Sequence, residues 1–369
     1  MPANPARLIV VGAGIVGSGC AYAAGGLGAE VVLVDANLPG RATSAGAGII
    51  CPWANSAADA ALFSFGCEAG RRYPGLVAAL TDEGEEVGYR QVGALVLADD
   101  FERAEQLRQS LMARQANHPE MGEVQTAADA RELFPPLRPT VAVRISGGAR
   151  IDGRLISAAL RRAAERSGAT VLAGDARLHL RGDRVSGVVV DGQTIEGDAV
   201  VAATGAWTDE FLRPAGLTLG VVPQRGQIMH IGLPGSDTSN WPVILPERSG
   251  HYLLAFDDSR VVAGATRETG AGFDYRVTPA GLAEVLDHAL SVAPGLAAGT
   301  YLETRIGFRP VGPDIRPVLG PAADGLVVAT GLGAEGLTMG PFTGEIAARA
   351  ALRESVPVDL APFYPLRAA

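Results

Sequence analysis

Residues 8–17 read Leu8-Ile9-Val10-Val11-Gly12-Ala13-Gly14-Ile15-Val16-Gly17, a short apolar run that ends in three spaced glycines and leads into a stretch of small residues. A second apolar run, Val31–Val34, ends at Asp35. The order of strand, glycine turn, helix, strand and acid is typical of units that bind a dinucleotide. Three spaced glycines alone are weak evidence in a chain with 48 glycines. The full context favours a cofactor site over a glycine-rich packing turn.

Each part of this stretch has a physical role in the expected site. Gly12 permits the tight turn, Gly14 lets the backbone approach a pyrophosphate, and Gly17 lets the helix pack close to the strand. The helix start at Ile15-Val16 offers N–H groups and a positive dipole end to the phosphates. Asp35 stands where a carboxylate can accept hydrogen bonds from ribose hydroxyls, and it disfavours a 2′-phosphate. This pattern leaves both FAD and NAD open.

Composition narrows the class of protein. The 369 residues are 47% hydrophobic, which is enough for two domains or one large elaborated one. The net charge is −9 and all 31 basic residues are arginines. These features argue against a nucleic-acid partner and exclude a lysine Schiff base. The three cysteines are too few and too scattered for a disulfide framework, and no Cys/His spacing suggests a metal site.

The N-terminal residues do not show the pattern expected of a secretory signal. Met1–Arg7 has no basic region followed by an apolar core, so we expect a cytoplasmic protein. The stretch Leu8–Ala29 has no charge and is long enough to resemble a membrane span. Its glycines and the clustering of its β-branched residues at one end favour the dinucleotide-binding unit instead. We therefore expect no integral membrane segment.

A second small-residue stretch follows Asp35. The side chains between Leu38 and Gly48 are too small and too rich in glycine for a stable helix throughout, so that backbone N–H groups could lie against a flat ring or a phosphate. An ordinary flexible loop is the alternative. The candidate cofactor-binding residues here are Arg41, Thr43, Ser44, Gly46, Ala47 and Gly48.

Periodicity predicts the other elements. The expected helices are Ala57–Leu80, Phe101–Gln115, Thr126–Phe134, Leu155–Ser167 and Pro279–Ala293. The expected strands include Gln91–Ala98, Thr170–Leu172, Ala176–Leu180, Arg184–Val190, Gly192–Glu196, Val221–Ile231, Tyr252–Ala255 and Val261–Ala265. The strand region at 176–180 contributes Arg177 as a further cofactor-binding candidate. His118, in a polar loop, is expected at the surface.

Two later segments are expected to belong to the same dinucleotide-binding fold as the N-terminal residues. Asp198–Ala203 is a continuous apolar run, which needs a sheet covered on both faces, and it ends in a turn with Thr204, Gly205 and Trp207 as candidates. Leu326–Thr330 is followed by a second glycine loop and a helix expected at Gly344–Leu352. The candidates in this loop are Gly333, Ala334, Glu335, Gly336, Leu337 and Thr338. A long ligand touched from both ends of the chain fits FAD better than NAD.

With these motifs in order, the chain resembles the FAD-dependent D-amino acid oxidase superfamily, and within it the glycine oxidase branch. The likeness rests on Val11–Gly17 with Asp35, Arg41–Ser44, Ala203–Trp207, Gly264-Ala265-Thr266, Gly307–Pro310 and Ala329–Gly344. It implies an α/β fold with a Rossmann-type FAD-binding domain and a substrate domain on an antiparallel or mixed sheet. The implied FAD domain comprises residues 1–82, 145–217 and 300–369, and the substrate domain residues 83–144 and 218–299.

The resemblance implies two substrate-binding residues. Arg309 matches the arginine that grips the substrate carboxylate, and a guanidinium in an apolar stretch indeed needs an anion to offset its desolvation. The alternative is an exposed arginine or one paired with a structural acid. Tyr252 matches the tyrosine whose hydroxyl also reaches the carboxylate, and the alternative is a tyrosine packed in the core. The neighbouring His251 could face the cleft instead.

The sequence departs from the family at three points. Ala334 and Glu335 stand where glycine oxidase has a second arginine, so fewer charges are expected to hold the carboxylate. Glu335 is either exposed or, in the cleft, able to attract a cationic amine. No cysteine lies near Arg309, so FAD is expected to be noncovalent. The family's oxygen-activating lysine is absent, so the chain uses another route to oxygen or passes electrons to another carrier.

The reaction implied is oxidation of an α-amino acid, namely glycine, a D-amino acid or an N-substituted amino acid, to an imine by hydride transfer to FAD, with hydrolysis to a 2-oxo acid. Competing hypotheses are a dehydrogenase with an acceptor other than oxygen, an NAD-linked dehydrogenase, and a flavin-binding subunit of a larger amine dehydrogenase complex. The expected partners are a small amino acid or amine and an electron acceptor. A homo-oligomer is compatible with the sequence, which does not fix the number of subunits.

Overall fold

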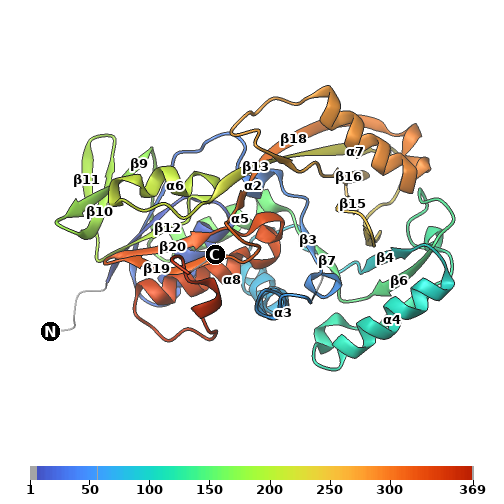
Figure 1. Cartoon of the computed structure of the whole chain (residues 1–369), viewed down its shortest axis with the longest axis horizontal. Helices are drawn as coiled ribbons and strands as arrows, with labels where there is room; N and C mark the ends of the chain where they lie inside the picture. Colours follow the sequence, from blue (N-terminus) through green and yellow to red (C-terminus); the bar gives the residue numbers. More distant parts are fainter. Residues whose placement is uncertain (1–5, 56, 368–369) are drawn as a thin grey trace.

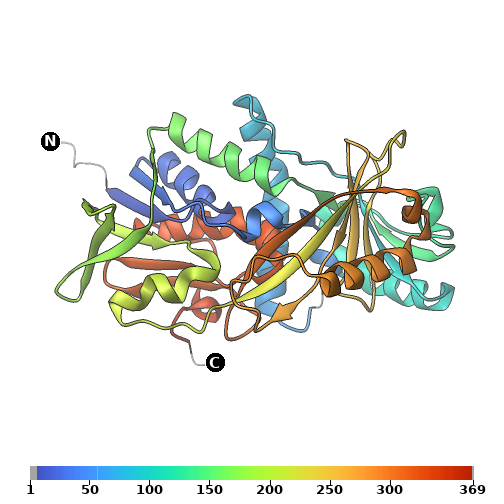
Figure 2. The same cartoon turned by 90° about the horizontal axis from the view of Figure 1, so that it is seen from above.

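The computed structural model describes residues 6–55 and 57–367. Two sheets organise it, and they lie side by side in Figures 1 and 2, with the N-terminal strands in one and the middle of the chain in the other. Two smaller sheets accompany them. Among the described residues, no helix is long and apolar enough to cross a membrane. The α/β fold with two sheets of different character is the fold class that the sequence predicts.

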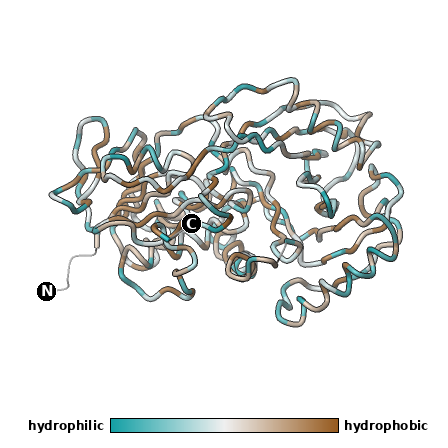
Figure 3. The backbone as a smooth tube through the Cα atoms, in the orientation of Figure 1, coloured by the Kyte–Doolittle hydropathy of each residue, from teal (hydrophilic) through white to brown (hydrophobic). Residues whose placement is uncertain are grey.

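The first sheet has six strands in the order β19-β20-β12-β1-β2-β8 and is parallel except for the β19–β20 pair. Its strands are β1 (Arg7–Val11), β2 (Glu30–Asp35), β8 (Thr170–Ala173), β12 (Ala199–Ala202), β19 (Val318–Ala323) and β20 (Leu326–Thr330). The central strands are buried on both faces, as continuous β-branched runs require. In Figure 3 the trace of these strands has mostly the colour of hydrophobic residues.

Helices from distant parts of the sequence cover this sheet. They are α1 (Ile15–Gly26), α3 (Ala60–Asp82), α5 (Gly153–Arg166) and α8 (Gly336–Ala351). Glycines allow α1 and α8 to approach closely, because a Cβ at Gly344 would lie 2.4 Å from the carbonyl oxygen of Val16. The first and last helices of the chain therefore pack directly on one another, in one core with β1 and β20.

The second sheet has nine strands and is mixed, because the β4–β14 pair is parallel and the other pairs are antiparallel. Its strands are β4 (Ala94–Ala98), β5 (Val124–Ala127), β6 (Val141–Ile145), β13 (Val222–Gly232), β14 (Val243–Pro246), β15 (Tyr252–Phe256), β16 (Arg260–Gly264), β17 (Glu268–Thr269) and β18 (Thr300–Val311). The helices α4 (Phe101–Gln115) and α7 (Pro279–Val292) lie on it. Figure 3 shows α4 as largely hydrophilic, as its charged sequence predicts.

The remaining elements connect these layers. β9 (Ala176–Arg181), β10 (Arg184–Val190) and β11 (Gln193–Glu196) form a three-stranded antiparallel sheet, and β3 (Ile49–Ile50) pairs with β7 (Ala149–Arg150). Two short helices lie in connections between strands: α2 (Ala42–Ala45) follows β2, and α6 (Thr208–Leu212) follows β12.

Three expectations about elements need correction. The segment Thr126–Phe134 is not a helix, because Val124–Ala127 is strand β5 and only Ala130–Glu132 forms a short 3-10 turn. The final helix begins at Gly336 rather than Gly344, so the second glycine loop is shorter than expected. Strand β18, expected with the FAD domain, pairs along its whole length with β13 in the nine-stranded sheet. The division into domains itself stays a prediction.

Candidate active site

A cavity of about 940 Å³ lies where the two large sheets meet. Both ends of the chain line it, since its wall includes the turn at Gly12–Val16 and the segment Leu332–Thr338. The nine-stranded sheet contributes wall residues from β13, β15 and β18. The two glycine loops that the sequence placed at one ligand are therefore adjacent in space.

The first glycine turn has the conformation that its residues require. Gly12 has φ of +99°, and a Cβ there would lie 2.4 Å from the carbonyl oxygen of Ala203. A Cβ at Gly17 would lie 1.7 Å from the carbonyl oxygen of Gly12. Gly14, Ile15 and Val16 form part of the cavity wall, whereas Gly17 does not. Gly17 thus sets the packing of α1 on β1, and the helix start faces the cavity.

Asp35 lies in the cavity wall at the end of β2. Its carboxylate accepts backbone N–H bonds from Ala13 and, at 2.6 Å, from Asn37. Arg41 donates to the same carboxylate at 3.2 Å. The acid therefore ties both glycine-rich segments together at one end of the cavity, with lone pairs left for a ligand.

The small-residue stretch after Asp35 folds against the helix start. The backbone N–H of Ile15 donates to Thr43 Oγ1 at 3.0 Å. Ser44 is not part of the cavity wall, and its hydroxyl donates to the carbonyl oxygen of Arg41 at 3.1 Å. The other five candidates of this stretch line the cavity, namely Arg41, Thr43, Gly46, Ala47 and Gly48.

The remaining cofactor candidates also reach the cavity. Those from the middle of the chain are Arg177, Thr204, Gly205 and Trp207. Those from the C-terminal segment are Gly333, Ala334, Glu335, Gly336, Leu337 and Thr338. Because α8 begins at Gly336, its first turn presents backbone N–H groups to the cavity, as α1 does from the opposite end of the chain.

Arg309 extends from β18 into the cavity. Its Nη1 donates to the carbonyl oxygen of Thr266 at 2.9 Å. The guanidinium crosses Gly226 of β13, where a Cβ would lie 2.7 Å from Nη1. Among the described residues, no carboxylate lies within 4 Å of it, and burial lowers the pKa of Arg309. The side chain is a partly buried cation whose counter-charge no residue of 6–55 or 57–367 supplies.

Tyr252 stands beside Arg309 at the start of β15, close enough for each side chain to affect the pKa of the other. Burial raises the pKa of the Tyr252 hydroxyl, so it is a neutral donor. The ring packs against Gly264, where a Cβ would lie 2.6 Å from the hydroxyl oxygen. The neighbouring His251 also lines the cavity, and its ring stacks on His288 of α7 at 3.7 Å.

Arg267 is another guanidinium of the cavity wall, close to Arg309, which the sequence reasoning missed. Its Nη1 donates to the carbonyl oxygen of Gly250 at 2.8 Å, and it is close enough to Arg309 to lower the pKa of that side chain. Among the described residues, Arg267 also has no carboxylate within 4 Å. The expectation that fewer charges hold the carboxylate stays a prediction, although the loop after β16 brings a second cation close to Arg309. The sequence feature that could have identified Arg267 is its position directly after the Gly264-Ala265-Thr266 motif.

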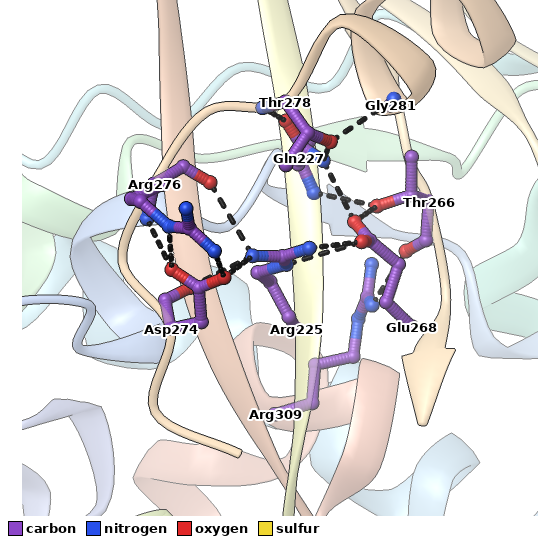
Figure 4. Close-up of polar contacts among 9 residues, drawn as sticks. All are labelled: Arg225, Gln227, Thr266, Glu268, Asp274, Arg276, Thr278, Gly281 and Arg309. Carbon is purple, nitrogen blue, oxygen red and sulfur yellow. Dashed lines mark hydrogen bonds and ion pairs between the residues drawn. The ribbon is translucent and has the colours of Figure 1, made fainter. Parts of the chain in front are cut away.

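The loop after β16, residues 265–278, is held by a polar network shown in Figure 4. Arg225 of β13 is the centre of the network and is only 6% exposed. Its guanidinium binds Glu268 at 2.5 Å and Asp274 at 2.8 Å. Arg276 on the surface binds Asp274 at 2.8 Å. These ion pairs fix both halves of the loop against β13.

A second part of the network links the loop to the start of α7 (Figure 4). The side chain of Gln227 donates to Glu268 and to Thr278 at 2.8 Å each. The Thr266 hydroxyl donates to Glu268 at 2.7 Å, and the carbonyl oxygen of Thr266 holds Arg309. The network therefore positions the loop that carries Arg267 and the carbonyl group that orients Arg309.

The cavity has the features that a flavin dinucleotide requires. Two helix starts and glycine backbones at Gly12 and Gly14 provide donors for phosphates, and Asp35 provides an acceptor for hydroxyl groups. The apolar and cationic wall from the nine-stranded sheet lies at the other side of the same cavity. Among the described residues, no group of three or more His, Cys, Asp or Glu side chains could hold a metal ion.

Comparison with known proteins gives one consistent result. Residues 7–350 match the family model described as FAD dependent oxidoreductase. An uncharacterized oxidoreductase of Bacillus subtilis, YurR, is 42% identical over 97% of this chain and 98% of its own length. The glycine oxidase of Pseudomonas aeruginosa is 32% identical over 97% of this chain and 98% of its own. The crystal structure of iminodiacetate oxidase from Chelativorans sp. BNC1 has a TM-score of 0.93 and 47% identity, and covers 97% of this chain and 99% of that chain.

Proposed function

Since the chain belongs to the family of FAD-dependent oxidoreductases, we propose that it oxidises a secondary amine that carries two carboxylates, of the iminodiacetate class. The observation that carries this proposal is the pair of guanidiniums, Arg309 and Arg267, that line one cavity without a carboxylate partner among the described residues. The likeness to an iminodiacetate oxidase supports the same substrate class.

The physical argument rests on desolvation. The two like charges repel each other, and Arg309 also loses hydration because it is half-buried, whereas Arg267 is exposed, so a bound ligand with two negative charges relieves both costs. A planar guanidinium also accepts a carboxylate through two parallel hydrogen bonds. A ligand with one carboxylate, such as glycine, would leave one cation unpaired. The site therefore favours a dicarboxylate over a simple amino acid.

The chemistry follows from the class of cofactor and substrate. When bound, FAD accepts a hydride from the carbon next to the amine nitrogen. Arg309 and Tyr252 hold one carboxylate beside that carbon, and Arg267 holds the other. The oxidised substrate carries a C=N bond, and addition of water releases glyoxylate and glycine from iminodiacetate. The amine must be neutral for hydride loss, so single-turnover rates should rise from neutral to alkaline pH.

The test is an anaerobic screen in which loss of flavin absorbance reports oxidation. The panel contains iminodiacetate, sarcosine, glycine, D-amino acids and proline. We expect iminodiacetate to bleach the flavin at the lowest concentration, with glyoxylate and glycine as products. Oxydiacetate, which has an ether oxygen in place of the amine, should bind as a competitor without bleaching. A faster reaction with a D-amino acid or glycine than with iminodiacetate would overturn the proposal.

A further inference from the structure

Glu335 is a carboxyl group of the cavity wall that belongs neither to the network of Figure 4 nor to an ion pair with Arg309 or Arg267. Glu335 lies in the cavity wall at the start of α8, where it is the N-cap residue of the helix. The helix start favours a negative charge there. The carboxyl group is therefore held at the opening of the final helix, on the side of the cavity built by the C-terminal segment.

The surroundings of Glu335 leave its charge available to a ligand. The side chain of Asn55 lies close enough to Glu335 to lower the pKa of its carboxyl group, the cation of Arg267 acts on it from the loop after β16, and the thiol of Cys51 lies near it. Among the described residues, no guanidinium lies within 4 Å of the carboxyl group. Burial raises the pKa of Glu335, and Asn55 and Arg267 oppose this effect. A half-buried acid without an ion-pair partner among the described residues is stabilised by a cationic ligand.

The charged groups of the cavity mirror those of the proposed substrate. Iminodiacetate has two carboxylates on either side of one ammonium group. Of the charged side chains in the cavity wall, three match this pattern: the guanidiniums of Arg309 and Arg267 on the side of the nine-stranded sheet, and the carboxyl group of Glu335 in the C-terminal segment. Such complementarity discriminates against ligands in which one of the three charges is missing.

On this basis, and resting on the proposed function, we propose that Glu335 pairs with the substrate ammonium and accepts its proton. The proton moves from nitrogen to the carboxylate oxygen, which leaves a neutral amine and a neutral carboxylic acid. The nitrogen lone pair is then free to form the C=N bond as the hydride leaves carbon. After product release, the proton passes from Glu335 to water.

The first test measures binding. Glu335→Gln keeps the shape and the Asn55 contact but removes the negative charge. We expect the apparent Kd for iminodiacetate, from the concentration dependence of anaerobic flavin bleaching at neutral pH, to rise roughly ten- to hundred-fold. The Kd for oxydiacetate, from perturbation of the flavin spectrum, should change little, because its ether oxygen carries no charge. An equal change for both ligands would overturn the inference.

The second test measures the pH dependence of bleaching in a single turnover. Glu335→Gln should move the acid limb of the profile toward the pKa of the free amine, and Glu335→Asp should restore part of the wild-type profile. His251, which also lines the cavity, supplies the competing base. If Glu335→Gln leaves the acid limb unchanged and His251→Asn moves it, Glu335 is not the proton acceptor.

The two proposals fail in different ways. If the wild-type protein binds oxydiacetate no better than methoxyacetate, the dicarboxylate assignment fails. The role of Glu335 is then decided with sarcosine and methoxyacetate, which differ by the same exchange of NH₂⁺ for oxygen. Loss of the preference for sarcosine in Glu335→Gln supports the role, and a retained preference overturns it.

Discussion

Arg309 and Arg267 reach the same cavity from different elements, β18 and the loop after β16. Three glycines make this possible, because Gly226 faces Arg309 and Gly250 faces Arg267, while Gly264 faces Tyr252 in the same way. At each position a Cβ would lie within 2.7 Å of the polar side chain. The placement of the site residues therefore depends on residues that carry no functional group.

The two arginines should differ in what they recognise. Arg309→Ala is expected to weaken the binding of both oxydiacetate and methoxyacetate by about 2–5 kcal/mol. The substitution removes the ion pair between the guanidinium and the carboxylate beside the reacting carbon. Arg267→Met should weaken oxydiacetate roughly tenfold or more and change methoxyacetate little. Spectral titration of the flavin gives all four Kd values. If Arg267→Met weakens the binding of both ligands equally, Arg267 binds the same carboxylate as Arg309.

A buried histidine should make stability depend on pH. His230 is 2% exposed, and its Nδ1 lies 2.9 Å from Arg260 Nη1. Burial, Arg305 and Arg260 lower the pKa of His230 to about 3. Between that value and the unfolded pKa of about 6.5, only the unfolded chain binds the proton, so stability falls as pH falls. Above the unfolded pKa this contribution is complete and constant.

The expected size of this effect is about 2 kcal/mol of unfolding free energy lost between roughly pH 6.5 and pH 5. Urea unfolding at a series of pH values measures it. His230→Gln should show a smaller loss over the same interval. His118→Gln, which changes a histidine outside this cluster, is the control. If the unfolding free energies of the wild type and His230→Gln fall in parallel with pH, a group other than His230 causes the loss of stability in acid.

At the scale of elements, the loop after β16 is the part of the site most dependent on one charge network. Glu268→Gln removes a negative charge from Arg225, which is 7% exposed as a side chain, and leaves Asp274 as its remaining ion-pair partner. We expect a loss of about 1–3 kcal/mol in unfolding free energy and weaker binding of oxydiacetate. The weaker binding follows because the single amide oxygen of Gln cannot accept from both Arg225 and Thr266, which now bind different carboxylate oxygens of Glu268.

Arg276→Gln is the matched control for Glu268→Gln. Arg276 belongs to the same network, but its side chain is 83% exposed and binds Asp274 from the surface. Its removal should change stability and ligand affinity little. If the two variants behave alike in urea unfolding and in spectral titration, the network is not what positions Arg267 and Arg309.

Elements with a clear local pattern were predictable from the sequence, and those defined by distant partners were less so. The turn at Gly12, the strands β2 and β20 and the helix α4 follow directly from glycine spacing and apolar periodicity. Strand β5 was wrongly expected as a helix, because its pairing with β6 is a tertiary contact. The early start of α8 was missed because glycines usually weaken a helix, whereas here Gly340 and Gly344 allow close packing on α1.

The candidate site shows the same division. Sequence motifs placed Arg309, Tyr252 and both glycine loops at one cavity, and the structure brings them together. Arg267 could not be recognised in this way, because an arginine in a polar loop is ordinary on a surface. Only the fold of residues 265–278 against β13 directs it into the cavity.

For the whole molecule, the contact between α1 and α8 joins the two ends of the flavin site. Gly344→Ala would place a Cβ 2.4 Å from Val16 O and 2.5 Å from Cys20 N, and helix backbones cannot yield easily. We expect lower FAD content in the purified protein and a loss of about 1–3 kcal/mol in stability. Gly26→Ala in α1 meets no atom within 4 Å and should retain full FAD content. Equal FAD content in both variants would contradict this coupling.

The positions of the three cysteines in the molecule also predict that FAD is held without a covalent bond. The three cysteines are buried, and of these only Cys51 lines the cavity, where burial raises its pKa to about 12. A thiol that stays protonated is a poor nucleophile toward a flavin ring. Acid precipitation should therefore release all the flavin into the supernatant. Yellow colour that stays with the precipitated protein would contradict this prediction.

The packing of the last helix on the first has a consequence for synthesis in the cell. A ribosome makes α1 first, but the wall contributed by Leu332–Thr338 emerges only after more than three hundred further residues have been translated. A nascent chain that has left the exit tunnel only in part offers the nucleotide an incomplete pocket. Flavin capture is therefore a late event, and riboflavin shortage should lead to accumulation of full-length apoprotein rather than arrested fragments.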